Sequence, residues 1–205
     1  MKKDLRKYKD YFLNFFGVLL LTLGILAVYN SINTGLAFQI FWMCYISLIL
    51  MGVGILSRNS FLVMSQIYIL TIPLLIWNID FFHWLIFDRA LWGITDYFFV
   101  NPTFNLGKIV SLQHIYSVPL AVYCVYLIRR KRNDEWKLSL VQSTLIFFIS
   151  FLFTPKYLNI NCVFKKCVDI SLGLPHQVNW FMIYFSTILV TAFIFNKILF
   201  LKVKK

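Results

Sequence analysis

Charged residues are scarce in this sequence, and acidic residues are scarcer than basic ones. Charged side chains make up 14% of the 205 residues, with 8 Asp and Glu against 20 Lys and Arg, whereas hydrophobic residues make up 60%. Soluble domains typically contain about 25% charged and about 45–50% apolar residues. The shortage of charge therefore argues against a soluble protein, and the length predicts one domain, residues 1–205, embedded in a membrane.

The sequence also lacks the short motifs of several familiar enzyme classes. It contains no G-x-S-x-G nucleophile elbow, no Walker A loop and no G-x-G-x-x-G fingerprint. It has no H-x-x-x-H or H-E-x-x-H pair, so no metal site is predicted, and any cofactor stays unknown. Paired carboxylates deep in a span, which a proton or cation carrier would favour, are missing as well.

Long apolar runs are what the sequence does contain. A helix needs about 20 apolar residues to cross a hydrocarbon core about 30 Å thick. Six runs approach this length: Phe12–Tyr29, Leu36–Leu56, Phe61–Ile79, Ile109–Ile128, Leu138–Thr154 and Val178–Phe200. They are continuous, without the alternation of a barrel strand, so they predict an all-α, polytopic transmembrane bundle. The basic start is followed by an overlong apolar run without an A-x-A-like site, which predicts an uncleaved first span.

Basic residues gather at alternate ends of these spans. Five of the 20 lie on one side: Arg89, Lys108, Lys156, Lys165 and Lys166. Lys197 lies at the end of the last span, and the other fourteen lie on the opposite side. The positive-inside rule then predicts a cell-membrane protein with both termini in the cytoplasm. The formal charge of +12 suits contact with anionic membrane lipids rather than nucleic acid, and a protein partner or homo-oligomer stays open.

The two outer loops, 80–108 and 155–177, are longer than the inner ones and are rich in chemistry-bearing residues. Phe81–Val100 is too apolar for a free loop, so we expect an interfacial or re-entrant helix there. All three histidines fall on this outer side, whereas Asp134 and Glu135 lie beside basic residues on the inner side and resemble ordinary solvated charge. Long loops of this kind are often functional.

The depth of Asp80, His83 and His114 makes them the candidate site, since ionisable groups near membrane depth usually face a bundle interior or a cavity. Asp96 and His176 are possible additions. A carboxylate beside an imidazole can perform acid–base chemistry near neutral pH. The alternative is that Asp80 and His114 hydrogen-bond each other and join two helices.

Two further pairs on the outer side have open interpretations. Arg89 and Asp96 share a face if their segment is helical, and Arg89 could hold an anionic headgroup or only form an ion pair. Cys162 and Cys167 lie in a compartment that permits disulfides, but the spacing alone cannot show that the two sulfur atoms meet.

Several short patterns resemble a family of small multi-span bacterial membrane proteins for which no activity is established. They are Trp77-x-x-Asp80-Phe81, Leu91-x-Gly93-x-Thr95-x-Tyr97, Leu112-x-His114 with Pro119, Thr154-Pro155, and Asn159-Ile160-Asn161-x-Val163-Phe164. The resemblance covers residues 77–164. It implies importance for Asp80, His114, Asn159 and Asn161. Cys162 and Lys165 depart from the family pattern, which has an aromatic residue and a glycine at these positions.

Three functional hypotheses remain open. The protein could be a transport subunit or accessory protein with an outward-facing pocket, as the architecture of substrate-capturing subunits of vitamin importers suggests. It could be an enzyme acting on a lipid or isoprenoid at the outer leaflet, with His114 as base and Asp80 orienting it. It could also be a purely structural membrane component. The sequence favours a non-enzyme because no strong catalytic constellation is present.

Overall fold

Helices are the only regular elements in the part of the chain that the structure describes. The structure, a computed structural model, describes residues 2–100 and 103–198. Five helical segments are long and apolar enough to cross a membrane: α1 (Lys2–Asn33), α3 (Ser60–Phe87), α5 (Leu106–Ser111) joined to α6 (Gln113–Ile128), α7 (Glu135–Phe153) and α8 (His176–Lys197). The chain is therefore an all-helical membrane protein, and the predicted fold class is confirmed. The end of the predicted sixth span, Leu199–Phe200, lies outside the described residues.

The predicted second span, Leu36–Leu56, is not one continuous helix. It is divided into a 3-10 helix, η1 (Ala37–Phe41), and a 14-residue α-helix, α2 (Met43–Leu56). Asn161 from the outer loop lies at the break, where its side-chain oxygen accepts from Met43 N at 2.9 Å and its nitrogen donates to Phe41 O at 2.8 Å. The side chain thus takes the place of helical hydrogen bonds at the break.

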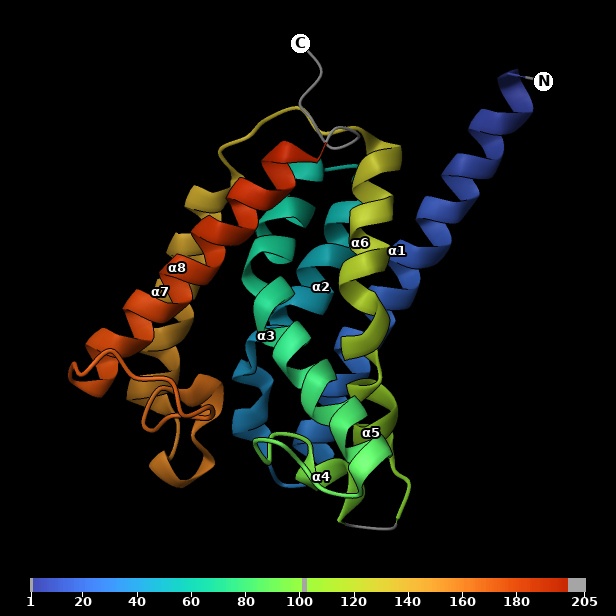
Figure 1. Cartoon of the computed structure of the whole chain (residues 1–205). Helices are drawn as coiled ribbons and strands as arrows, with labels where there is room; N and C mark the ends of the chain where they lie inside the picture. Colours follow the sequence, from blue (N-terminus) through green and yellow to red (C-terminus); the bar gives the residue numbers. More distant parts are fainter. Residues whose placement is uncertain (1, 101–102, 199–205) are drawn as a thin grey trace.

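The helices form two groups around α3 (Figure 1). Helices α1, α2 and α6 lie on one side of α3, and α7 and α8 lie on the other side and diverge from α3 toward one end of the bundle. The N-terminal end of α1, the connection 129–134 and the C-terminal end of α8 share the opposite end. The start of α1 and the end of α8 thus lie at the same end of the bundle, as an even number of membrane crossings requires. We call the end that holds 129–134 the inner end, following the predicted orientation, and the other the outer end.

Glycines allow α1 and α2 to pack closely. A Cβ atom at Gly52 of α2 would lie 2.6 Å from the Leu21 backbone nitrogen of α1, and one at Gly24 would lie 2.6 Å from Ile49. Small residues at such contacts are common in membranes, where van der Waals packing holds helices together. The outward faces carry exposed apolar side chains such as Phe15 and Leu152, which suit contact with lipid.

Glu135 corrects the sequence-based interpretation at the inner end. It was expected to be solvated, but it is fully buried and forms a two-pronged ion pair with Arg130, whose Nε donates to one carboxylate oxygen at 2.8 Å and whose Nη2 donates to the other at 2.6 Å. Arg130 also donates to the Tyr68 hydroxyl of α3 at 2.7 Å. The buried charges are thus paired, and they tie the start of α7 to α3.

Candidate functional site: a cavity between α3 and α8

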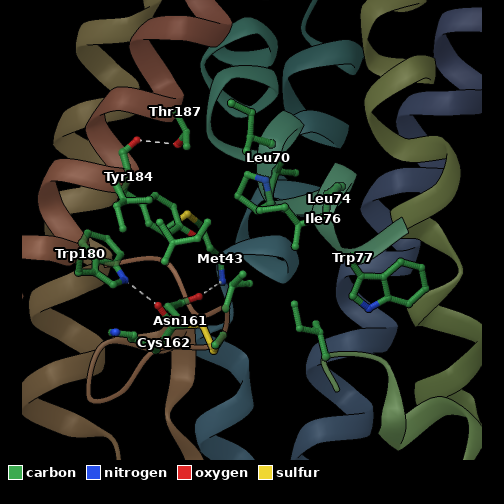
Figure 2. A pocket seen from close by; sticks show the side chains of 18 of the residues that line it. Met43, Leu70, Leu74, Ile76, Trp77, Asn161, Cys162, Trp180, Tyr184 and Thr187 are labelled. Carbon is green, nitrogen blue, oxygen red and sulfur yellow. Dashed lines mark hydrogen bonds between the residues drawn. A yellow bond between two sulfur atoms is a disulfide. The ribbon is translucent and has the colours of Figure 1, made fainter. Parts of the chain in front are cut away.

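A cavity of about 270 Å³ lies between α3 and α8 on the outer half of the bundle (Figure 2). The α8 wall is formed by residues between His176 and Thr187, and the α3 wall by residues between Leu70 and Trp77. The start of α2 and the outer loop close it at the end where Met43, Asn161 and Cys162 lie. The cavity therefore lies where α7 and α8 diverge from α3.

The lining of the cavity is almost entirely apolar, and its polar groups come mainly from the outer end. Leu74, Trp77, Trp180, Ile183 and Tyr184 form much of the walls. The polar and charged side chains at the outer end come from His114, Asn161, Lys166, His176 and Asn179. A concave apolar site with a few placed polar groups is the usual form of a small-molecule site.

The structure places only some of the predicted site residues at this cavity. His114, Asn161, His176, Cys162 and Cys167 line it, whereas Asp80, His83, Arg89, Asp96 and Asn159 do not. Within residues 2–100 and 103–198, no three His, Cys, Asp or Glu residues lie together as a metal ion would require. The lining therefore suits binding better than chemistry that needs a carboxylate.

Asp80 organises the first outer loop and does not bond to His114. Its carboxylate accepts from the backbone nitrogens of Leu91 and Trp92 at 2.8 and 2.7 Å, and from the nitrogen and hydroxyl of Thr95 at 2.8 Å each. The side chain is fully buried, and these four bonds use both of its oxygens. The predicted hydrogen bond between Asp80 and His114 is therefore wrong, because loop donors occupy the carboxylate.

These bonds also explain why Phe81–Val100 is not a separate interfacial helix. Phe81–Phe87 extends α3, Asp88 adopts a left-handed conformation that ends the helix, and only α4 (Asp96–Phe99) forms a further turn. Asp80 holds the intervening backbone against α3. Arg89 and Asp96 consequently do not share a helical face. His83, one turn after Asp80, directs Nδ1 to the Arg89 carbonyl oxygen at 2.8 Å.

His114 lies in an aromatic stack at the edge of the cavity. Its ring stacks on Trp77 with centroids 4.6 Å apart, and its Nδ1 lies 2.6 Å from the Ser111 carbonyl oxygen, so that nitrogen donates. The Trp77 indole donates to the Tyr97 hydroxyl, which donates to the Ser111 hydroxyl at 3.0 Å. Partial burial raises the pKa of the half-exposed Tyr97 above its ordinary value. Its hydroxyl is protonated at neutral pH even without this rise. The first outer loop is thus joined to two cavity-lining rings.

Asn159 and Asn161 fold the second outer loop. Both have positive φ, a conformation that Asn tolerates better than most residues. Asn159 Oδ1 accepts from the backbone nitrogens of Phe164 and Lys165 at 3.0 Å each. Besides bridging the break before α2, Asn161 donates to the Ser150 hydroxyl of α7, and its carbonyl accepts from the Trp180 indole of α8 at 2.8 Å (Figure 2). Asn161 thereby connects α2, α7 and α8 at the end of the cavity.

Cys162 and Cys167 are joined by a disulfide, the pairing that the sequence left open. The bridge closes a short turn that lines the cavity, and His176 Nε2 lies 2.9 Å from the Cys162 carbonyl oxygen. The first residue of α8 is thereby hydrogen-bonded to this turn. The disulfide joins the two ends of this turn covalently.

Sequence reasoning missed the α8 wall and the buried ion pair. Trp180, Ile183 and Tyr184 lie in an apolar run that looks like any other span, so no signal distinguishes a cavity wall from a lipid-facing or packed surface. The position of Glu135 could have indicated the ion pair, because an acid next to the first apolar residues of a span can pair with an Arg on the preceding connection.

Comparison of the chain with protein-family models, with curated proteins and with solved structures finds no match in any of the three. The family resemblance of residues 77–164 therefore stays a prediction. The residues that carry it have structural roles here: Asp80 and Thr95 close one outer loop, and Asn159 and Asn161 close the other.

Proposed function

We propose that this protein resides in the cell membrane and captures a small, largely apolar molecule from the outer side, as a transport subunit or as an accessory binding protein. The observation that carries the proposal is the cavity between α3 and α8, whose walls are apolar and whose polar groups gather at the outer end. Apolar surface buried from water contributes about 25 cal/mol per Å². Such a lining favours an apolar ligand over a water-soluble vitamin, which would need more hydrogen-bonding partners.

The same geometry weakens the enzyme hypothesis. An acid–base pair needs the carboxylate within hydrogen-bond reach of the imidazole. The Asp80 carboxylate instead accepts hydrogen bonds from Leu91, Trp92 and Thr95 on both of its oxygens. The His114 ring donates to the Ser111 carbonyl oxygen. A binding role requires neither group to titrate. We therefore favour capture over catalysis.

Filling the cavity should abolish binding. Ile183→Trp places a larger side chain on the α8 wall of the cavity, whereas Leu189→Trp makes the same kind of change at a position that is 46% exposed and does not line the cavity. We expect the wild-type protein and L189W, purified in mild detergent, to retain a small molecule that mass spectrometry detects after organic extraction. I183W should retain less than about a tenth as much.

Thermal unfolding supplies the control for this comparison. I183W and L189W should both stay folded, since the added ring enters a void in one case and faces lipid in the other. Equal amounts of the same extracted molecules in wild type, I183W and L189W would contradict the proposal, because such molecules would be annular lipid.

A further inference from the structure

The cavity has one cationic group at its outer end, and this group indicates the class of ligand. Among the described residues that line the cavity, Lys166 is the only Lys, Arg, Asp or Glu. It pairs with Asp169 at 3.3 Å, and the side chains of Lys166 and Asp169 are 40% and 97% exposed. Ion pairs between exposed groups are weak. An anion that enters the outer end of the cavity can therefore replace Asp169 as the partner of the Lys166 ammonium group.

The cavity extends from this cation as an apolar channel along α8. The α8 residues that line it are His176, Asn179, Trp180, Ile183, Tyr184 and Thr187. They recur at intervals of three, one, three, one and three residues, which is the stripe of one helical face. At 1.5 Å per residue this stripe is about 16 Å long. Figure 2 shows Trp180, Tyr184 and Thr187 following one another along α8, opposite Leu70 and Leu74 of α3.

Polarity falls along this channel from the outer end inward. Lys166 lies at the outer loop beside Asn161 and His176, whose side chains already bond within the protein. Pro73, Leu74 and Ile183 line the walls further in. Thr187 introduces no free donor deeper in the channel, because its hydroxyl donates to the Tyr184 carbonyl oxygen at 2.7 Å. A molecule that matches this gradient has a charged head and one long apolar tail.

We propose that the ligand is an anionic, single-chain amphiphile whose acidic head binds Lys166 and whose tail lies along the α8 stripe. This inference rests on the proposed capture function and narrows it to a ligand class. Charge complementarity favours an acid over an amine, and the cavity volume of about 270 Å³ favours one chain over two. A diacyl lipid and a neutral alcohol are the alternatives that the experiment must distinguish.

Three probes with one chain length test the charge requirement: dodecanoate, dodecanol and dodecylamine. Trp42, Trp77 and Trp180, half of the six tryptophans, line the cavity, so chain-brominated analogues that enter it should quench the intrinsic fluorescence. For the wild-type protein we expect the brominated acid to bind at least about tenfold more tightly than the alcohol, and the amine to bind most weakly.

The matched variants are Lys166→Gln and Lys165→Gln, neighbours on the same exposed turn of which only Lys166 lines the cavity. K166Q should weaken binding of the acid by about tenfold and leave binding of the alcohol unchanged, and K165Q should resemble wild type. If acid and alcohol bind equally and K166Q changes neither, the charge inference fails while the cavity remains a binding site. If no probe quenches the fluorescence of the wild-type protein, the proposed function itself fails. If a brominated diacyl lipid quenches the fluorescence and the single-chain probes do not, the single-chain inference also fails.

Discussion

Replacing Glu135 with glutamine should destabilise the protein by about 3–5 kcal/mol, the usual cost of removing one partner from a buried ion pair. Glu135 and Arg130 are both buried, with side-chain exposures of 0% and 1%. Glutamine fits the same space but leaves the Arg130 guanidinium without a neutralising charge. The expected result is a clear fall in the melting temperature of the purified protein, measured in the same detergent as wild type.

The preceding residue in the chain supplies the control. Asp134 pairs with Arg132 at 2.6 Å, the same distance as the shortest contact in the buried pair, but those two side chains are 31% and 59% exposed. Asp134→Asn should therefore leave the melting temperature nearly unchanged. The double variant Arg130→Met/Glu135→Leu should be more stable than Glu135→Gln, because it removes both charges together. Equal melting temperatures for E135Q and D134N would show that Arg130 is solvated, against the structure.

Replacing Asp80 with asparagine should release the first outer loop. The asparagine amide has one oxygen and one NH₂ group, so donors that now meet a carboxylate oxygen would face another donor. Three of those donors are backbone N–H groups, from Leu91, Trp92 and Thr95. Since hydrogen bonds to charged groups contribute about 1.5–3 kcal/mol each, we expect a loss of at least about 2 kcal/mol. Hydrogen exchange at residues 91–95, followed by mass spectrometry, should accelerate.

The stability and the hydrogen exchange of D80N also distinguish a positioning role for Asp80 from a catalytic role. A catalytic carboxylate could be lost while the fold and the exchange rates stay the same. Asp88→Asn is the matched control, since Asp88 is exposed and its φ of 54° suits asparagine. D88N should exchange and melt like wild type. If D80N kept both wild-type exchange at residues 91–95 and wild-type stability, the loop-anchoring role of Asp80 would be wrong.

The membrane-spanning elements were largely predictable because they depend on one property, a long run of apolar residues. The predicted fifth span, Leu138–Thr154, nearly coincides with α7, and the fourth ends at Ile128 as α6 does. The division of the second span was not predictable. It depends on Asn161, which lies more than a hundred positions along the chain from the backbone groups that it contacts at the break.

The site was only partly predictable, because depth and residue type indicate that a group is important without showing its partners. Asp80 and His114 were both selected, and both are buried, yet they bond to different parts of the chain. Asp134 and Glu135 are adjacent acids with the same basic neighbours, yet Glu135 pairs with the buried Arg130 and Asp134 with the exposed Arg132. Arg130 in turn donates to Tyr68 on another helix. In these cases, contacts between segments that are distant in the sequence determine the partners and the burial of each side chain.

The central claim is that the α3–α8 cavity lies toward the outer side of the membrane, and labelling from outside intact cells tests it most directly. Tyr157→Cys and Asn133→Cys place a thiol at exposed positions on the outer and inner ends of the bundle. The native Cys44 and Cys124 are replaced by alanine first. A membrane-impermeant maleimide should label Y157C in intact cells and N133C only after permeabilisation. The reverse pattern would turn the cavity toward the cytoplasm and contradict outward capture.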